Sequence, residues 1–397
     1  MGQSYGPKLV TDSLILCLDA HDANSYAGEP VTNLVSSSAV DFSVRSGYTG
    51  NTFSQVEDSE SPSGYACEMS YTGTVNSASR CRFGDADDIP TSGSGFVSIW
   101  AKKSGGTSAT MRPKVYTGYT WYDLDPLDGG SIYFTSEYRP FGKAVTFGTS
   151  SSGPNPGFSM THAGGSTSSD RTKWIKPQVT TLSYNVPFAN LSRSATNGWA
   201  DLSGNGNHGT LTNMTGTGAS HYKDGQVIKP LANSYLDFDG SNDYVATSFG
   251  SGRNPHSSPT TFVAWVKSDT ATANKMWLDH GLNGTNQRLY SALITADNPN
   301  IFGIQNQAWG YSSSADTSKW YHQALVMDSG TARGYYDGIA AGTKSYSSYT
   351  LPGNTRAGGR ASYIWDGQIA CFAVYDKALS AAEVKKNFNA QRRRFGV

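Results

Sequence analysis

The 397-residue sequence has no net charge, few cysteines and no long hydrophobic run. Basic and acidic residues number 31 each, so charge gives no reason to expect nucleic acid or an anionic membrane as a partner. The first apolar run, Leu14–Leu18, is too short for a membrane span or a signal-peptide core, and no basic segment precedes it. We therefore expect a protein made in a cytoplasm, with neither nucleic acid nor membrane as a partner.

Glutamate is also scarce: only six of the 31 acidic residues are Glu, and the rest are Asp. Glu favours helices, whereas Asp favours turns and caps. Together with 44 glycines and 23 tyrosines, this composition is typical of short strands joined by many turns. We expect an all-β fold.

One short helix is predicted near the C-terminus. Ser380 and Glu383 have the spacing of a capping box, and Val384 and Phe388 form an apolar stripe. We expect this helix to pack across a sheet edge and to bring the C-terminus near the first strand. The basic run Arg392–Arg394 that follows is expected at a solvated end, or docked on an acidic neighbour in an assembly.

The most informative stretch is Trp199–Val245. It begins W-A-D-L-S-G-N-G-N-H-G and ends Y-L-D-F-D-G-S-N-D-Y-V. Its glycines and asparagines suit tight turns, and the alternation in Tyr235–Phe238 predicts a half-buried strand. We expect a polar turn, a short strand, and then a strand pair hinged near Asp239 and Gly240.

This stretch resembles the laminin-G-like branch of the concanavalin A-like lectin/glucanase family. Further segments continue the resemblance through Thr261–Lys267, Trp320–Val326, Trp365–Ile369 and Tyr375–Ser380. The resemblance implies a jelly-roll β-sandwich and leaves the ligand undefined, because this fold hosts many functions. The opening Ser13–Ala20 and the closing Asn387–Val397 are similar to tailed-phage virion proteins with this domain, which implies a particle component.

The domain order predicts one sandwich inserted in another. Residues 1–28 would supply the first strand of the lectin-like domain, residues 29–197 an inserted jelly-roll-like domain, and residues 198–397 the remainder, because the gap is too long for a loop. The insert repeats a pattern of the outer domain: F-V-S-I-W-A-K around Trp100 matches T-F-V-A-W-V-K around Trp265.

The order of motifs in the insert is similar to jelly-roll carbohydrate-binding modules of phage tail and fibre proteins. We expect strands near residues 131–135 and 143–148, and a loop at 150–169 that is rich in Ser, Gly and Pro. Residues 174–197 are expected to lead back to the outer domain.

No catalytic, cofactor-binding or metal-binding residues are predicted. Gly204, Gly206 and Gly209 fit the G-x-G-x-x-G pattern, but the residues after them would not start a helix, so a plain turn is expected. Glucanases of this family use an E-x-D-x-x-E strand. Here Glu57 and Glu60 lie only three apart in a polar loop, so the departure from the family pattern argues against glycoside hydrolysis.

Two aspartate-rich loops, Asp123–Gly129 and Asp237–Asp243, carry clustered oxygen ligands of the kind that calcium prefers. Neither has the spacing of the twelve-residue helix–loop–helix calcium site. The alternative, which we favour, is that these aspartates cap turns through nearby backbone amides. The sequence leaves calcium binding open and predicts no other cofactor.

Five aromatic residues are candidates for stacking on a sugar ring: Trp121, Tyr122, Trp277, Trp309 and Trp365. The alternative for each is packing in the core or at the rim of a sandwich. Sequence spacing alone does not separate the two.

Cys17, Cys67, Cys81 and Cys371 are expected to stay reduced in a cytoplasm. The family resemblance leaves open a bond between Cys17 and Cys371, because the first and last strands of such sandwiches often neighbour each other.

We expect a non-enzymatic virion surface protein, either a capsid decoration or a tail-fibre component. Its partners would be other virion proteins, further copies of itself and host-surface glycans. The alternatives are a glycan-processing enzyme of the concanavalin A-like class and an architectural cement protein without a ligand.

Overall fold

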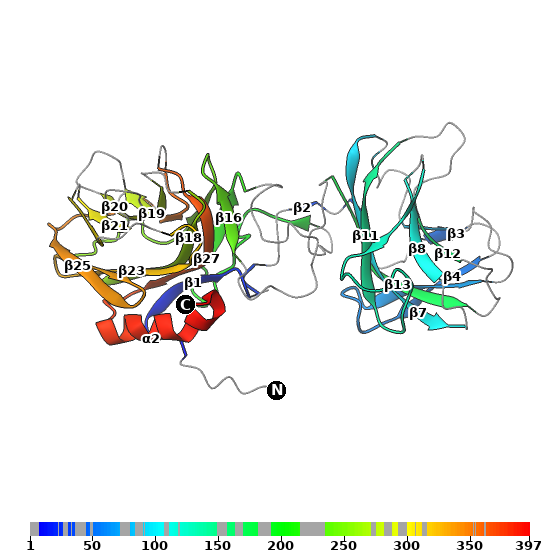
Figure 1. The fold of residues 1–397 in the computed structure, drawn as a ribbon, viewed down its shortest axis with the longest axis horizontal. Coiled ribbons are helices and arrows are strands. Elements are labelled where there is room, and N and C mark those ends of the chain that lie inside the picture. Colours follow the sequence, from blue (N-terminus) through cyan, green and yellow to red (C-terminus); the bar gives the residue numbers. More distant parts are fainter. Residues whose placement is uncertain are drawn as a thin grey trace. The chain divides into compact units, whose positions relative to one another are not determined.

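A computed structural model describes most of the chain. The described residues are 8–22, 24–26, 31–32, 34–35, 45–47, 51–71, 80–83, 90, 92–106, 111–117, 120–148, 157–162, 170–181, 192–214, 235–270, 275–281, 288–292, 300–305, 307–311, 316–351, 353, 355–360 and 363–397. The chain divides into two compact units (Figure 1). Unit 1 comprises Met1–Pro30, Ser194–His221 and Pro230–Val397, and unit 2 comprises Val31–Arg193 and Tyr222–Lys229.

Unit 1 contains two seven-stranded antiparallel sheets. The back sheet has the order β1 (Leu14–Asp19), β27 (Asp366–Tyr375), β18 (Thr260–Ser268), β23 (Tyr321–Asp328), β24 (Thr331–Tyr336) and β25 (Ile339–Ser345), with β16 (Leu236–Asp239) also paired to β27. The front sheet has the order β15 (Gly209–Thr212), β17 (Tyr244–Thr247), β26 (Arg356–Ala357), β19 (Met276–Gly281), β20 (Arg288–Ala292), β21 (Asn300–Ile304) and β22 (Gln307–Tyr311).

The two sheets of unit 1 pack face to face. Trp277 on β19 is fully buried, and its ring lies 6.2 Å from that of Phe372 on β27. The side-chain oxygen of Gln323 on β23 accepts hydrogen bonds from the Trp277 indole and, at 2.9 Å, from the Ser291 hydroxyl on β20. These contacts make a sandwich with a continuous core, in which the buried glutamine is satisfied from the opposite sheet.

Unit 2 is a second antiparallel sandwich. Its six-stranded sheet has the order β10 (Asp125–Pro126), β11 (Arg139–Thr146), β7 (Ser94–Gly105), β13 (Arg171–Thr180), β5 (Tyr65–Tyr71) and β4 (Asn51–Glu57). Its five-stranded sheet has the order β3 (Arg45–Gly47), β6 (Arg80–Phe83), β12 (Gly157–His162), β8 (Met111–Tyr116) and β9 (Trp121–Asp123). Buried side chains of β7, β8 and β13 share one core cluster.

The chain enters and leaves unit 2 through paired segments. Strand β2 (Val31–Thr32) runs antiparallel to β14 (Ser192–Arg193). These residues stand beside the boundaries expected for the insertion, residues 29 and 197.

The expected fold class is confirmed: both units are antiparallel β-sandwiches, and one short helix follows the last strand. Three expectations within unit 2 are wrong. Residues 131–135 form no strand, whereas Gly157–His162, expected in a loop, is strand β12 between β6 and β8. Trp174 does not lead back to unit 1, because β13 lies at the centre of the six-stranded sheet of unit 2.

The expected strand pair around Asp239 and Gly240 is wrong in its pairing. Strand β16 joins the back sheet and β17 joins the front sheet, so the turn carries the chain from one sheet to the other. Gly240 has a φ of +74°, and a Cβ there would lie 2.8 Å from the side chain of Asp366. A glycine is therefore required where the chain crosses between the sheets.

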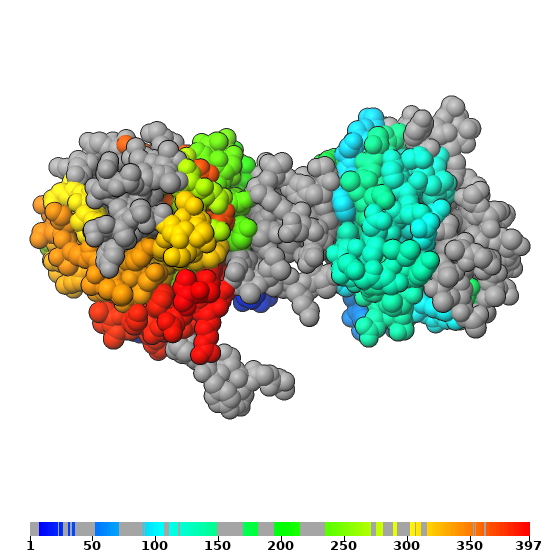
Figure 2. All heavy atoms as spheres, viewed as in Figure 1, coloured from blue at the N-terminus to red at the C-terminus, as the bar shows by residue number. Residues whose placement is uncertain are grey.

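Helix α2 (Ala381–Gln391) begins at the predicted capping box. The Glu383 amide donates to the Ser380 hydroxyl at 3.3 Å, and the Ser380 amide donates to the Glu383 carboxylate at 2.9 Å. The helix covers the outward face of the central strands of the back sheet, not an edge: Val384 packs with Val263 and Ala324 in one buried cluster. Figure 2 shows the helix, in red, on the surface of unit 1.

The basic run after the helix is not wholly solvated as expected. It forms the 3-10 turn η2 (Arg392–Phe395), in which Arg392 and Arg393 are exposed. Arg394 instead donates to both carboxylate oxygens of Asp19 on β1, at 2.8 and 3.0 Å. This half-buried ion pair fixes the C-terminal segment beside the first strand, as Figure 1 also shows.

The motif W-A-D-L-S-G-N-G-N covers the outer edge of β1. The Asp201 carboxylate accepts from the Cys17 amide at 2.9 Å, and the Leu202 amide donates to the Cys17 carbonyl at 2.8 Å. The side-chain amides of Asn205 and Asn207 donate to the carbonyls of Leu14 and Ile15. The motif therefore satisfies the edge of the back sheet with loop groups in place of another strand.

We expect Asp201→Ala to lower the free energy of unfolding by about 2 kcal/mol, because partly buried backbone amides lose a charged acceptor. The carboxylate also accepts from the Ser203 and Asn207 amides, at 2.9 and 3.0 Å. Urea denaturation monitored by circular dichroism measures the change. Asp316→Ala, which removes a turn-capping carboxylate from an exposed loop, is the matched control and should cost less than half as much. Equal losses would contradict the edge-capping role.

Candidate functional site

The outward face of the front sheet carries one continuous row of cross-strand partners, with one residue from each of the seven strands. Across the sheet the row is Thr210, Ala246, Arg356, Asp279, Tyr290, Gly303 and Ala308. The neighbouring positions Leu211, Val245 and Leu278 are buried on the opposite, core side. Because side chains alternate along each strand, the row faces away from the core.

Arg356 and Asp279 are neighbours in the strand register in the middle of this row. Asp279 is 1% exposed, whereas Arg356 is half-buried. The guanidinium carbon of Arg356 lies 4.2 Å from the centre of the Tyr244 ring on β17. The arginine is therefore held in place by an aromatic ring on one side.

Tyrosines also stand on the other side of the pair. The Tyr290 ring lies over Gly303 of β21. A Cβ at this position would collide with the ring, so the ring fits only because residue 303 is a glycine. Tyr290 and Tyr363 are half-buried and pack on the buried Met276. We call Tyr244, Arg356, Asp279, Tyr290 and Tyr363 the tyrosine face.

The chemistry of the tyrosine face suits a sugar. Tyrosine rings offer apolar surfaces with hydroxyl tips, and a half-buried guanidinium can donate hydrogen bonds to sugar hydroxyls. Sequence analysis missed these residues because they form no motif. They meet only through strand register, and Arg356 lies in a two-residue strand. The one local signal is Tyr244. Its side chain points to the outward face of the sheet, because the next residue, Val245, faces the core.

Two of the predicted sugar-stacking residues are in the core, so that hypothesis is wrong for them. Trp277 and Trp365 are both fully buried. Trp277 fills the space between the sheets, where its indole has a hydrogen-bond acceptor in Gln323. Burial of a large aromatic ring between the two sheets stabilises the fold, whereas exposure of the same ring to water does not.

The other three aromatic candidates are half-buried. Trp309 packs 5.9 Å from Phe302 and lies over Gly342 of β25, so it fills the space between the sheets at their edge. In unit 2, Trp121 lies 5.1 Å from Tyr116, and Tyr122 packs against the core. Glycan contact through Trp121 and Tyr122 stays a prediction.

The carboxylates of the loop Asp123–Gly129 form ion pairs. Asp123 contacts Arg112 at 2.5 Å, Asp125 contacts Lys143 at 3.1 Å, and the Arg139 Nε donates to Asp128 at 2.7 Å. Burial acts to raise the pKa of Asp128, but Arg139 holds it below its usual range. These cations supply the positive charge that a calcium ion would bring.

The carboxylates of the loop Asp237–Asp243 cap turns and accept from neighbours. Asp239 accepts from the Ser241 amide at 2.8 Å, and Asp243 accepts from the Asp239 amide at 3.1 Å. Burial raises the pKa of Asp243 to about 6. Among the described residues, no cluster of three or more His, Cys, Asp or Glu could hold a metal ion. Turn capping accounts for this loop, and calcium binding stays an untested hypothesis.

The glycine pattern forms the expected turn, whereas only Glu60 of the glutamate pair lies in a loop, because Glu57 ends strand β4. Gly204 and Gly206 have φ values of +85° and +72° in a turn, and strand β15 follows in place of a helix. Glu57 is exposed at the end of β4, while Glu60 lies in the next turn and contacts Lys102 at 2.7 Å.

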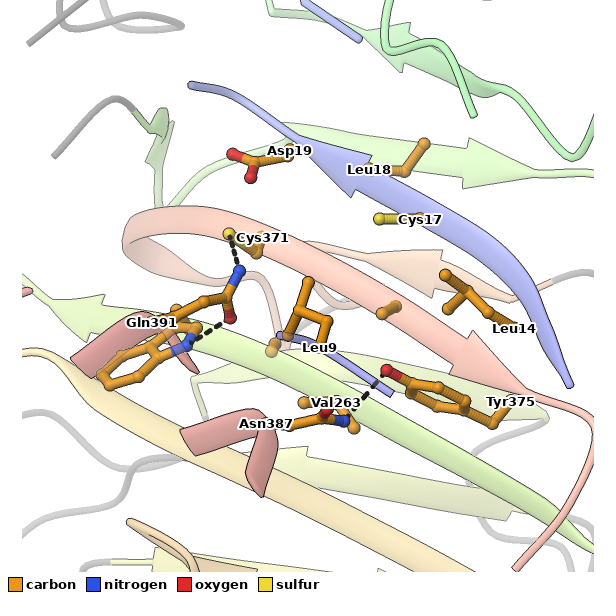
Figure 3. Close-up of a pocket in the computed structure, with 13 residues that line it drawn as sticks. Leu9, Leu14, Cys17, Leu18, Asp19, Val263, Cys371, Tyr375, Asn387 and Gln391 are labelled. Carbon is orange, nitrogen blue, oxygen red and sulfur yellow. Dashed lines mark hydrogen bonds between the residues drawn. The ribbon is translucent and has the colours of Figure 1, made fainter. Parts of the chain in front are cut away.

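A cavity of about 20 Å³ lies beneath helix α2, lined by Cys17, Cys371, Val263 and Asn387 among others (Figure 3). This volume admits about one water molecule and no substrate. Both cysteines are free thiols, as is Cys67. Burial raises the pKa of Cys17 to about 12 and also raises that of Cys371, so neither thiol is activated as a nucleophile. Cys81 lies among residues whose side chains are not described.

Comparison with known proteins gives a family for much of unit 1. A family model described as the concanavalin A-like lectin/glucanases superfamily matches residues 239–385. These residues form a concanavalin A-like domain. The matched range includes β17 to β27 and part of α2, and therefore all five residues of the tyrosine face. No curated protein is significantly similar to the chain.

Several solved structures share a low similarity with parts of the chain. Domain 4 of AbnA, a GH43 extracellular arabinanase from Geobacillus stearothermophilus, is 16% identical over 48% of this chain and 92% of that chain, with a TM-score of 0.37. The CBM40 of a Ruminococcus gnavus IT-sialidase is 21% identical over 32% and 81%, with a TM-score of 0.28. The binding domain of botulinum neurotoxin serotype D is 14% identical over 48% and 48%, with a TM-score of 0.36. At these values the matches identify no function for the concanavalin A-like domain.

No helix within the described ranges combines the length and the hydrophobicity needed to cross a membrane.

Proposed function

We propose that this protein binds glycans through the tyrosine face and does not cleave them. The observation that carries the proposal is the row Arg356–Asp279–Tyr290, flanked by Tyr244, on the outward side of the front sheet. A sugar would lie across the tyrosine rings while its hydroxyls bond to the Arg356 guanidinium and to the tyrosine hydroxyls. Such a platform recognises shape and hydroxyl pattern without a deep pocket.

The charge of the row supports binding over hydrolysis. Glycosidases need two carboxyl groups about 5 to 9.5 Å apart on either side of the scissile bond. The row contains one carboxylate, Asp279, and its side chain is buried. A single buried carboxylate does not supply such a pair.

We further propose that the protein is a surface component of a tailed-phage virion, as a capsid decoration or part of a tail fibre, and self-associates there. The support is the similarity of Ser13–Ala20 and Asn387–Val397 to virion proteins of this type. Many copies on one particle would multiply weak contacts with host glycans. Immunogold labelling of purified particles tests this placement, and particles without label would contradict it.

We expect Arg356→Ala to weaken glycan binding at least tenfold, because the variant removes the only guanidinium of the row. A glycan array identifies a ligand, and isothermal titration calorimetry then measures the dissociation constants of wild type and variant. Arg333→Ala on β24 removes a half-buried arginine from the other sheet and is the matched control, with unchanged binding expected.

Three outcomes would overturn the proposal. Equal binding by both arginine variants would place the ligand elsewhere. Shortening of an oligosaccharide during incubation with the wild type, seen by mass spectrometry, would identify a glycan-processing enzyme. A blank array, together with loss of particle stability when the protein is removed, would favour an architectural cement protein.

A further inference from the structure

Unit 2 has an aromatic and cationic surface of its own, on the outward face of the six-stranded sheet. Val97, Ile99 and Ala101 of β7 belong to the core cluster, so alternation turns Trp100 outward. Trp100 packs at the border of a second cluster that contains Tyr138 and Ile175. Trp100 is half-buried. The ammonium group of Lys176 lies 4.2 Å above the centre of the Trp100 ring.

The backbone is distorted at the residue that covers Trp100. Register between β13 and β7 shifts between Ile175 and Gln178, which marks a β-bulge at Lys176 and Pro177. Lys176 has a φ of +55°, a left-handed conformation that costs energy for any residue with a side chain. The bulge turns the lysine side chain back over the central strand, and bulges of this kind often re-aim a side chain at a functional site.

Lys176 differs from the other lysines of this face in its charge partners. Lys102 contacts Glu60 at 2.7 Å and lies over the Tyr138 ring, and Lys173 contacts Asp58 at 3.3 Å. Within the described part of the chain, Lys176 forms no salt bridge with any carboxylate. Its ammonium is half-buried, and this burial lowers its pKa, although Glu60 partly opposes the shift. Among the described residues, the Lys176 ammonium therefore lies on an aromatic ring, influenced by Glu60 but with no carboxylate at salt-bridge distance.

The equivalent tryptophan of unit 1 shows what such a ring can bind. Trp265 is the outward tryptophan on β18, at the position that matches Trp100 in the sequence. Its ring stacks on Phe395 with 4.1 Å between the ring centres and 18° between the planes. In unit 1, this position is filled by another planar group of the same chain. In unit 2, among the described residues, the ammonium group of Lys176 occupies the corresponding position over Trp100. A lysine side chain is flexible and can move aside.

We infer that the Trp100–Lys176 pair is a second binding site, specific for acidic polysaccharides. A sugar ring would stack on the indole, and its carboxylate would pair with the Lys176 ammonium. The site is independent of the tyrosine face, because it lies in the other unit and uses different residues. Lys102, Lys173, Asp58 and Glu60 hold the surrounding surface in place: Asp58 accepts from the Tyr138 hydroxyl at 2.9 Å.

Binding of the full chain to polygalacturonate, alginate and polysialic acid tests this site, with carboxyl-reduced polygalacturonate as the neutral probe of the same backbone. Biolayer interferometry at low and at physiological salt measures the affinities. We expect binding to at least one acidic polymer, at least tenfold weaker binding to the carboxyl-reduced probe, and weaker binding at higher salt. Lys176→Gly and Trp100→Ala should each weaken the binding at least tenfold.

Lys176→Gly separates a binding role from a structural one. Glycine adopts the left-handed conformation without strain, so we expect the melting temperature to stay the same or to rise while binding is lost. Lys143→Ala on β11 removes one lysine from the opposite face of the same sheet and is the matched control, with unchanged binding expected. Arg356→Ala should also leave binding of the acidic polymers unchanged. The test of the Trp100–Lys176 site is therefore separate from the test of glycan binding at the tyrosine face.

The inference is overturned if none of the three acidic polymers binds, if the carboxyl-reduced probe binds equally well, or if Lys176→Gly binds like the wild type. A clear fall in melting temperature for Lys176→Gly would identify the lysine as a structural residue.

Discussion

Phe395→Ala is expected to lower the free energy of unfolding of unit 1 by about 4 kcal/mol. Phe395 is 5% exposed, and it stacks on Trp265 and packs 5.0 Å from Trp320. Its removal opens a cavity on the outward face of the back sheet and loosens η2, which carries the Arg394–Asp19 ion pair. Urea denaturation followed by tryptophan fluorescence measures the loss, because Trp265 reports on this contact directly.

Arg393→Ala is the control for Phe395→Ala. Arg393 lies in the same turn and is exposed, so its removal should change stability by no more than about 0.5 kcal/mol. A loss below about 1 kcal/mol for Phe395→Ala would show that the stacked rings do not hold the C-terminal segment on the sheet.

Acidification from pH 7 to pH 5 is expected to lower the stability of unit 1 by about 3 kcal/mol. His280 and His322 are both fully buried, and burial lowers the pKa of each to about 3, with Arg360 and Lys385 adding to the respective shifts. Each histidine is neutral in the folded protein and binds a proton in the unfolded chain below pH 6.5. Stability is therefore lost as the pH falls from 6.5 towards 3.

The contributions of single groups to this pH dependence have opposite signs. Each histidine accounts for about 2 kcal/mol of loss over these two pH units, and Asp243 opposes them by about 1 kcal/mol because its pKa is raised to about 6 in the folded state. Urea midpoints at several pH values give the slope. His322→Leu should halve the histidine contribution. An unchanged slope in His322→Leu would contradict the assignment.

Features encoded by neighbouring residues were predictable from the sequence. The capping box of α2 needs only Ser380 and Glu383, and the hairpin between β24 and β25 needs only Asp337 and Gly338, whose φ values are +49° and +74°. The turn Gly204–Gly206 is likewise local. In each case the decisive hydrogen bonds or backbone angles lie within a few residues of one another.

Features that depend on register between distant strands were not predictable. The depth of Trp277 is set by Phe372 and Gln323 on the opposite sheet, and the spacing of tryptophans along the chain holds no information on that. The same is true of the tyrosine face, where Arg356 meets Asp279 only through pairing of β26 with β19. Strand β12 was missed because Ser and Gly dominate its surroundings, although pairing with β6 and β8 overrides that local preference.

The loop over β1 also limits how copies of this protein can join. A strand from another molecule could extend the back sheet at β1 only by displacing the Asp201, Leu202, Asn205 and Asn207 hydrogen bonds. With this strand covered, addition of strands from copy to copy cannot proceed through β1, even where many copies are crowded together.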